Sequence, residues 1–499
     1  LIVNTFTTAI LSFTPVMQRL IYTLFLFSLF LYTAEVCAQS KLKATADFVY
    51  LPEKNGDEYN QRVPQKTIAL NQNEFAILSR QASNAYSVEK YNASLKKSWS
   101  ATIPLTGNET VEAFYTSPVS AVVITLRKTN EKQLLHAHRV NLQTGEKQST
   151  VLLLESPAKG RRASIAHSPD GSKLLAYRYH TDNNQQINDI SGVLFDVNLQ
   201  KIADRKYNLN DISGILTTEI KVSNTGEQYV CLISDNMNRL TVRQYTTSTP
   251  QATVMSVLVG GVYNSSKVYI LDSRFELMPN NTLYGAVLTA EEETGRYYSL
   301  KAVRFDFEAN DMVFADEFKF TKAYVDKVTP PGKNNREPRL EDIYLSDLLL
   351  SKNGKLTVIA EKKYTEGGEN APYFAEDLHL FTYDEYMSTA WNAVLRKQQK
   401  APADEAFSGI SYRTKASDNT IHLLTLEELN GKYDLYLRQI DSDSGNITAA
   451  KPIGINVASD KNLAYVKDFT AWLTDKNLIT VVRPSKKAEG LRLSHIQVK

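Results

Sequence analysis

Two kinds of strand alternate along most of this chain, and together they predict an all-β fold. The first kind is a short, continuous apolar run that follows a polar turn, as in Ser168–Ser172 before Leu174–Tyr177. The second kind alternates apolar and polar residues, as in Leu378–Tyr383. Continuous apolar runs indicate strands buried on both faces, and period-two alternation indicates half-buried strands. Helical three-four spacing is absent over most of the sequence, and short helical turns are expected only near Tyr386–Gln399.

The unit of turn, apolar strand and alternating strand occurs eight times. Its turns are centred near Gln72, Pro118, Asp170, Thr225, Asn280, Asn353, Asp418 and Asp475. Each unit supplies about four strands, and the spacing between units varies, as expected for a repeat with variable loops. Such a series predicts a β-propeller, in which every blade covers the apolar face of the next and circular closure removes exposed ends. Eight four-stranded blades are favoured, with seven as the alternative.

A second repeated motif begins with an aromatic residue followed by Asp or Asn. A long apolar residue follows the Asp or Asn at plus three, and Trp follows at plus seven. The two full copies are Tyr383-Asp384 with Met387 and Trp391, and Tyr91-Asn92 with Leu95 and Trp99; the partial copies are Phe195-Asp196 with Leu199, Phe305-Asp306 with Ala309, and Ile440-Asp441. Because an Asp or Asn side chain can bond the backbone two residues on, the motif predicts a strand that reverses into a hairpin.

The two ends of the repeat array are complementary. The last unit, Tyr465–Val498, has only three strands, whereas Lys43–Leu51 is a lone strand before the first full unit. We predict that the lone strand completes the last blade and so joins the two ends of the chain. The alternative is a loose amino-terminal extension, since residues near a terminus are often poorly ordered.

The first residues are typical of a signal peptide. Met17-Gln18-Arg19 precedes the apolar block Leu20–Tyr32, and the small residues before Gln39 suit cleavage after Ala38. The block is shorter than the about 20 apolar residues of a membrane span. The alternative is an uncleaved anchor, because residues 6–16 would lengthen the apolar run if Leu1 were the true start. We therefore predict a signal peptide with a possible upstream extension over residues 1–38, and a single exported propeller domain, periplasmic or extracellular, over residues 39–499.

Composition excludes several classes of function. After cleavage Cys231 is the only cysteine, so no internal disulfide is expected, and its apolar neighbours favour a buried thiol over a reactive one. Lys and Arg number 57 against 55 Asp and Glu, with the signs interspersed. The absence of a basic stripe argues against nucleic acid as a partner. We expect a monomer without a stable membrane span after cleavage.

The segment His167–Tyr177 reads His-Ser-Pro-Asp-Gly-Ser-Lys-Leu-Leu-Ala-Tyr. It resembles the Ser-Pro-Asp-Gly-x-x-Leu hairpin of the TolB-like and WD-repeat-like propellers of bacterial envelope proteins. Less regular copies are Ser223–Gly226 and Ser351–Gly354. In such a hairpin Pro fixes φ, Asp bonds the backbone and Gly takes the left-handed conformation. The resemblance implies a propeller over Leu42–Val498 and carries no catalytic residue, because the motif is structural.

Residues that suggest chemistry are few. His136 and His138 share one strand face and are candidate metal ligands, but without a third ligand a solvated strand face is favoured. Asp441–Asn446 is similar to a calcium loop, yet it lacks Gly at position six and has Pro452 at position twelve, so a hairpin turn is favoured. No Gly-x-Ser-x-Gly elbow is present. The sequence therefore identifies no catalytic, cofactor-binding or metal-binding residue, and no cofactor is expected.

The two insertions and the many aromatic residues can each be interpreted in two ways. Thr329–Pro338 lies between blades and Tyr364–Phe374 lengthens a turn; long loops on a rigid scaffold often bind ligands, and these could equally be neutral drift. The 27 Tyr and 19 Phe would suit sugars or peptides if exposed on a face of the propeller. Burial of these rings between strands is favoured.

We expect a binding or assembly platform for an envelope protein, a peptide or a glycan. This expectation follows from fold analogy. The alternatives are a lyase or hydrolase with its site at the mouth of the central channel, and a sensor module from a larger system. Titratable residues from different blades at one end of the channel would favour catalysis, and an apolar or aromatic rim would favour binding.

Overall fold

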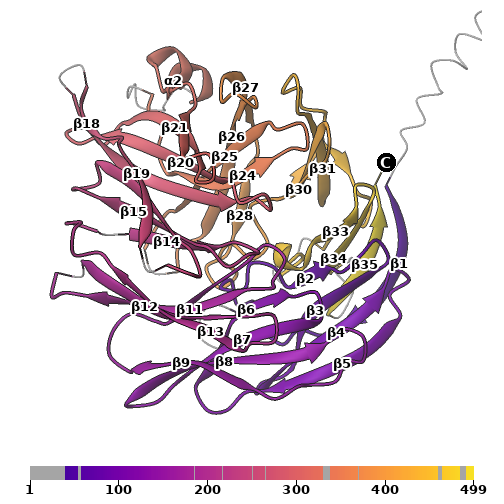
Figure 1. The fold of residues 1–499 in the computed structure, drawn as a ribbon. Coiled ribbons are helices and arrows are strands. Elements are labelled where there is room, and N and C mark those ends of the chain that lie inside the picture. Colours follow the sequence, from indigo (N-terminus) through magenta and orange to yellow (C-terminus); the bar gives the residue numbers. More distant parts are fainter. Residues whose placement is uncertain are drawn as a thin grey trace, which may run out of the picture.

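The protein is an eight-bladed β-propeller (Figure 1). The computed structural model describes residues 40–498 except 54–57, 185, 216, 250, 264–265, 330–337, 369, 459–462 and 484–489. Eight antiparallel sheets follow one another around a ring in sequence order, and within each blade the chain runs from the central channel outwards. The eight sheets confirm the count of units made from the sequence.

Blades 1 to 4 each contain four strands in sequence order. Blade 1 comprises β2 (Thr67–Ala69), β3 (Glu74–Ala82), β4 (Ala85–Asn92) and β5 (Lys97–Pro104); blade 2 comprises β6 (Glu109–Thr116), β7 (Ser120–Lys128), β8 (Lys132–Asn141) and β9 (Val151–Pro157). Blade 3 comprises β10 (Ser164–His167), β11 (Leu174–Thr181), β12 (Ile187–Phe195) and β13 (Lys201–Asn208); blade 4 comprises β14 (Thr217–Val222), β15 (Gln228–Ser234), β16 (Arg239–Tyr245) and β17 (Ala252–Leu258).

Blades 5 and 6 carry additional short strands. Blade 5 comprises β18 (Gly261–Tyr263), β19 (Ser266–Leu277), β20 (Leu283–Glu291), β21 (Tyr297–Asp306), β22 (Asp311–Phe314) and β23 (Phe318–Lys319); blade 6 comprises β24 (Ile343–Leu350), β25 (Leu356–Thr365), β26 (Tyr373–Tyr383), β27 (Thr389–Leu395) and β28 (Gln399–Ala401). The helix α2 (Lys322–Val328) lies in the connection between these two blades. Blade 7 comprises β29 (Arg413–Ala416), β30 (Thr420–Leu429), β31 (Lys432–Asp441) and β32 (Lys451–Pro452).

Blade 8 closes the ring with strands from both ends of the chain. Its inner strands are β33 (Ala471–Thr474), β34 (Asn477–Val482) and β35 (Leu491–Gln497), and β33 follows the 3-10 turn η1 (Lys467–Phe469). The fourth strand is β1 (Lys41–Phe48), which pairs antiparallel with β35 from Lys41 opposite Gln497 to Phe48 opposite Leu491. The predicted closure by the amino-terminal strand is confirmed. The predicted signal peptide lies outside the described residues.

The motif of an aromatic residue and Asp or Asn forms the turn between the third and fourth strands of a blade. Oδ1 of Asp384 accepts hydrogen bonds from the backbone N of Tyr386 at 2.9 Å and of Ser388 at 2.8 Å. Asn92 and Asp196 make the equivalent pair of bonds in blades 1 and 3. In these three copies the apolar residue at plus three has a positive φ and is buried, at Leu95 (61°), Leu199 (58°) and Met387 (67°); in the partial copy at Phe305-Asp306, Ala309 is exposed and the positive φ falls on Asn310. Burial of the apolar side chain offsets the cost of a left-handed conformation.

The Trp of the full motif fastens one blade to the next. Nε1 of Trp391 in blade 6 donates to the carbonyl of Ser442 in blade 7 at 2.9 Å. A Cβ on Gly445, in the same turn, would lie only 2.6 Å from the Trp391 ring. Trp99 of blade 1 and Gly145 of blade 2 repeat the arrangement, with a corresponding distance of 2.5 Å. The Trp therefore packs flat against a turn in which only Gly fits.

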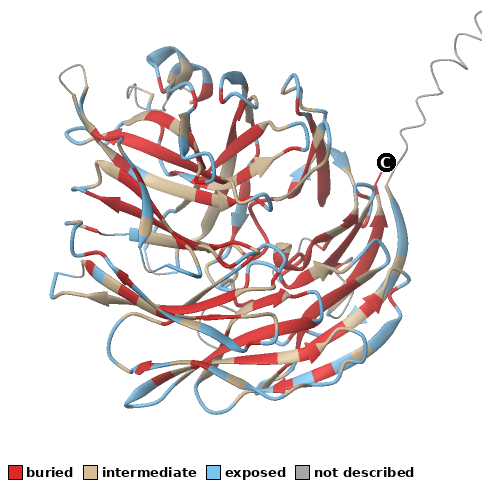
Figure 2. Ribbon diagram, in the orientation of Figure 1, coloured by how far each residue is buried: buried red, intermediate tan, exposed pale blue. Residues whose placement is uncertain are grey.

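The core consists of apolar clusters that lie between neighbouring blades. One cluster joins Tyr115 and Val122 of blade 2 to Leu174 and Phe195 of blade 3, and comparable clusters lie at the other junctions. Figure 2 shows burial concentrated in the middle strands of the sheets, with exposed residues in turns and outer strands. Five tyrosines are among the largest fully buried side chains, at positions Tyr86, Tyr207, Tyr229, Tyr383 and Tyr465. Their burial follows the interpretation favoured from the sequence.

The helical prediction near Tyr386–Gln399 is wrong. This region forms a turn followed by β27 and β28, because β27 pairs along its length with β26. The helix α2 was missed because it has only seven residues. Thr321 caps it by accepting a hydrogen bond from the backbone N of Tyr324 at 3.3 Å, and Val328 is its buried residue. No helix among the described residues is long and apolar enough to cross a membrane.

Candidate functional site

The central channel contains a cavity of about 690 Å³ on the side of blades 1 to 5. Its walls are the innermost strands of these blades, together with the residues that lead into β2 and β10. The titratable residues in the wall are Arg62, Glu112, Arg162, His167, Glu219, Lys221 and Glu276. They come from five different blades, which is the arrangement expected to favour catalysis.

The charges in the channel are largely paired with one another. Nε of Arg162 in blade 3 donates to Glu112 in blade 2 at 2.8 Å. Lys221 in blade 4 lies 2.8 Å from Glu219 on its own strand and 3.5 Å from Glu276 in blade 5. Burial opposes the charge of Lys221, but the two carboxylates raise its pKa above the usual value. These pairs hold neighbouring blades together and leave a polar wall.

One histidine in the channel has a fixed tautomer. Nδ1 of His167 lies 2.9 Å from the carbonyl O of Ser168, and a carbonyl only accepts, so Nδ1 carries the proton. Water reaches the ring along the channel, while the surrounding walls desolvate it and lower its pKa, so the ring is neutral at pH 7. The ring stacks on Tyr115 with centroids 4.5 Å apart. Its Nε2 is therefore a hydrogen-bond acceptor.

A second cavity, of about 900 Å³, lies on the face of the ring where the two insertions emerge. We call it the blade 6–7 pocket, because its walls come from α2, residues 339–343, blade 6 and the strands β30 and β31 of blade 7. Carboxylates and cations occur in equal number, namely Asp326, Glu341, Glu376, Asp377, Glu427 and Glu428 against Lys327, Arg339, Lys362, Arg396, Lys397 and Arg438. Such a surface both donates and accepts hydrogen bonds along its whole length.

The wall of this pocket includes the buried His379, which forms an uncharged pair with the half-buried Tyr324. Nδ1 of His379 on β26 lies 2.8 Å from the hydroxyl of Tyr324 on α2. Burial, together with the nearby positive charges of Arg396 and Lys362, lowers the pKa of His379 to about 4. Burial also raises the pKa of Tyr324. At pH 7 the tyrosine and the imidazole are therefore both neutral and share one hydrogen bond.

A buried ion pair supports the floor of the same pocket. Nζ of Lys397 lies 2.8 Å from Oε1 of Glu361, and both side chains are fully buried. Lys397 also donates to Oε1 of Gln399 at 2.7 Å, and Ser411 donates to Glu361 at 2.6 Å. Burial lowers the pKa of Lys397, and the Glu361 carboxylate opposes this effect. Because these groups satisfy one another, they position the wall rather than offer a free ligand.

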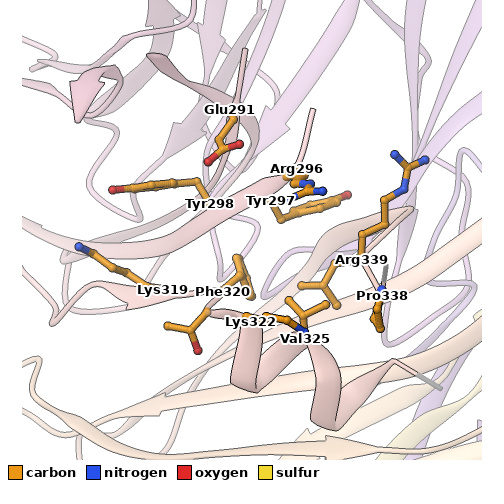
Figure 3. Close-up of a pocket in the computed structure, with 12 residues that line it drawn as sticks. Glu291, Arg296, Tyr297, Tyr298, Lys319, Phe320, Lys322, Val325, Pro338 and Arg339 are labelled. Atoms are coloured by element: carbon orange, nitrogen blue, oxygen red, sulfur yellow. The ribbon is translucent and has the colours of Figure 1, made fainter. Parts of the chain in front are cut away.

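A third and smaller cavity, of about 340 Å³, lies beside α2 and is called the α2 pocket (Figure 3). Tyr297, Tyr298 and Phe320 supply its aromatic wall. Its titratable side chains apart from the two tyrosines are Arg296, Lys319, Lys322 and Arg339 against the single carboxylate Glu291. The α2 pocket and the blade 6–7 pocket share Arg339 and Leu340.

The two histidines considered as metal ligands lie in a polar cluster. Nε2 of His138 lies 3.0 Å from the hydroxyl of Thr125, and Nδ1 of His136 lies 3.8 Å from a carboxylate oxygen of Glu109. His138 is buried, so the prediction of a solvated strand face is wrong for it: a neighbouring strand supplies the polar partners. Burial opposes the charge of Glu109, but hydrogen bonds from His138 and Thr125 lower its pKa to about 2. Among the described residues no three His, Cys, Asp or Glu side chains are arranged to hold a metal ion.

The calcium-like segment and the single described cysteine follow their predictions. Oδ1 of Asp441 accepts from the backbone N of Asp443 at 3.1 Å and of Ser444 at 2.7 Å, which makes a hairpin turn. Cys231 is buried in β15, and burial raises the pKa of its thiol. The channel cavity had no signal in the sequence, because its residues come from five blades spread along the chain.

Comparisons with known proteins show no family for this chain. No family model matches the chain, and no curated protein matches it. Among solved structures, a PL25 ulvan lyase is 10% identical with a TM-score of 0.40, covering 76% of this chain and 90% of the lyase. The β-propeller domain of the Trilobed protease from Pyrococcus furiosus is 11% identical with a TM-score of 0.35, covering 75% and 89%. Dipeptidyl peptidase 4 of Porphyromonas gingivalis is 11% identical with a TM-score of 0.43, covering 84% and 56%. The likeness concerns the propeller architecture and gives no argument about activity.

The neutral state of His379 predicts a pH effect on stability. The pKa is about 4 in the folded protein and about 6.5 when unfolded, so the unfolded chain takes up the proton first as the pH falls. The stability that neutral His379 contributes to the folded protein is fully present above about pH 6.5 and is lost as the pH falls from there to about pH 4. Between pH 7 and pH 4 the free energy of unfolding of the wild type should therefore fall by about 3 kcal/mol more than that of a His379→Gln variant. Urea unfolding of both proteins across this pH range measures the difference. Equal changes of the two free energies of unfolding with pH would contradict the prediction.

Proposed function

We propose that this protein is exported and monomeric, and that it binds a glycan in the blade 6–7 pocket without changing the glycan chemically. The observation that carries the proposal is the equal number of carboxylates and cations along that pocket. A purely anionic or cationic ligand would meet as many repulsive as attractive groups there. A hydroxyl-rich ligand donates to carboxylates and accepts from cations, so the exposed charges of both signs in the wall can bind it.

Rigidity of the pocket supports the same proposal. Lys397 and Glu361 are buried beneath it, and Tyr324 connects α2 to His379 of blade 6. Walls that are fixed before binding lower the entropy cost of holding a flexible oligosaccharide. Thr329, the first residue of one insertion, lines the pocket, and Lys362 and Glu376 line it beside the other, which fits the pattern of binding sites near loops on a rigid scaffold.

The test is binding of the mature protein, residues 39–499, to an array of glycans. Arg396 pairs with Asp377 at the pocket wall. We expect a double variant, Arg396→Ala with Asp377→Ala, to weaken binding of the captured glycan about tenfold or more, as for the loss of charge-assisted hydrogen bonds. Lys132→Ala with Glu155→Ala removes a comparable exposed pair in blade 2 and should leave binding unchanged. Equal affinity of the two double variants would contradict the proposal.

A catalytic function at the channel is the second candidate. It is favoured by His167, whose Nε2 faces solvent as an unprotonated acceptor beside Tyr115 and could serve as a general base. Incubation of the wild type and of His167→Gln with the captured glycan separates the two functions. Cleavage by the wild type alone would favour a hydrolase or lyase, and intact glycan in both samples favours binding.

Export and family membership are parts of the same proposal. The apolar segment within residues 1–38 supports export to the periplasm or beyond. The Ser168–Gly171 hairpin supports a distant relation to TolB-like or WD-repeat-like propellers. Its Gly171 has a φ of 69°, and a Cβ there would lie 2.1 Å from the Thr116 carbonyl O. A single structural hairpin is the extent of that support.

A further inference from the structure

The α2 pocket differs in charge from the other two cavities. Four cations, Arg296, Lys319, Lys322 and Arg339, face one carboxylate, Glu291. The channel and the blade 6–7 pocket are balanced in comparison. The lining of the α2 pocket therefore favours an anionic group.

The arrangement of side chains suits a ring that carries the anionic group. Figure 3 shows Tyr298 and Lys319 at one end of the pocket, Arg339 at the other, and Tyr297 between them above α2. Tyr297 is held in place because its hydroxyl bonds both the carbonyl O of Ile343 at 2.8 Å and its backbone N at 2.9 Å. The aromatic wall can pack against the face of a sugar ring. The cations on either side of this wall can pair with an acidic substituent on the same ring.

The carboxylates around the pocket are weak competitors for these cations. Lys322 pairs with Asp326 at 2.7 Å, and their side chains are 71% and 44% exposed. Arg339 pairs with Glu341, at 60% and 51% exposure. Exposed pairs of this kind contribute only about 0–1 kcal/mol. A ligand with its own carboxylate or sulfate can replace them at small cost.

The position of the pocket connects it to the proposed binding site. Arg339 and Leu340 line both the α2 pocket and the blade 6–7 pocket, so a chain bound in the larger one can continue into the smaller one. We propose that the α2 pocket is a subsite for a carboxylate or sulfate carried on a sugar, which makes the ligand an acidic glycan. This inference rests on the proposed function. An acidic peptide fits less well, because it offers fewer hydroxyl groups than a glycan to the carboxylates of the larger pocket.

The experiment uses matched glycans that differ only in charge. The mature protein is titrated with oligogalacturonate and with its methyl ester, and with sulfated and unsulfated forms of the glycans on the array, at low and high salt. We expect the acidic member of a bound pair to be preferred about tenfold at low salt, with the preference shrinking at high salt because exposed charges are screened.

Variants test whether the preference for the acidic glycan arises in the α2 pocket. Lys319→Gln with Lys322→Gln should reduce the acidic-to-neutral ratio to near one while leaving affinity for the neutral form unchanged. Lys132→Gln with Lys201→Gln removes two lysines of similar exposure from blades 2 and 3 and should keep the full preference. Unchanged thermal unfolding confirms that the variants are folded.

The outcomes separate this inference from the proposed function. If neutral and acidic forms bind equally, or if the Lys319 and Lys322 variant keeps the preference, the acidic subsite is wrong and glycan binding stands. If poly-glutamate binds in place of every glycan, or if no glycan binds, the proposed function is wrong and the subsite falls with it.

Discussion

Replacing Asp468 with alanine should lower the free energy of unfolding by about 3–5 kcal/mol, because the charge of Lys66 would remain buried without its carboxylate. Lys66 has no exposed surface, and its Nζ lies 3.1 Å from Oδ2 of Asp468. The same ammonium group donates to the carbonyls of Asn60 at 2.9 Å and Val63 at 2.7 Å. Arg413 holds the other oxygen of Asp468 at 2.9 Å. The carboxylate thus joins blades 7, 8 and 1 beside the closure of the ring.

Urea unfolding of the mature protein measures this effect. The matched control is Asp475→Ala, which removes a more exposed partner of Lys415 at 3.5 Å and should cost less than about 1 kcal/mol. A further variant, Lys66→Met with Asp468→Leu, replaces the charges by apolar groups and should recover most of the loss. Equal stability of the Asp468→Ala and Asp475→Ala proteins would show that the buried pair does not fasten the ring.

Replacing Gly445 with alanine should destabilise the protein by about 2–4 kcal/mol, the sum of a left-handed backbone penalty and overpacking. The φ of Gly445 is 72°, and the new Cβ would lie 2.6 Å from the ring of Trp391. The indole must move, and it then loses its hydrogen bond to Ser442. Thermal or urea unfolding measures the change.

The control for Gly445 lies in the same blade. Gly431 has the same φ of 72°, and no atom lies within 4 Å of its would-be Cβ, so Gly431→Ala should show only the backbone part, about 1–2 kcal/mol. The difference between the two variants is the contribution of the Trp391 contact. If both variants lose the same stability, the indole adjusts freely and the contact does not fasten blade 6 to blade 7.

The candidate sites show where sequence reasoning ended. His136 and His138 were found by their spacing, but Glu109 was missed because it comes from another strand of the sheet. Tyr324 and His379 lie 55 positions apart, and only the packing of α2 against blade 6 brings them to 2.8 Å. No local pattern marks either residue, so no motif could have paired them.

The sequence alone determined the all-β class, the eight units and the strand that closes the ring. Turns such as Ser168–Gly171 and apolar runs such as Leu174–Tyr177 act over a few residues, and period and spacing carry that information directly. Only the tertiary structure decided that Trp391 packs on Gly445, that Lys66 meets Asp468, and which charges gather in each pocket. These contacts join different blades, and the variable loops between repeats remove any fixed spacing from which they could be predicted.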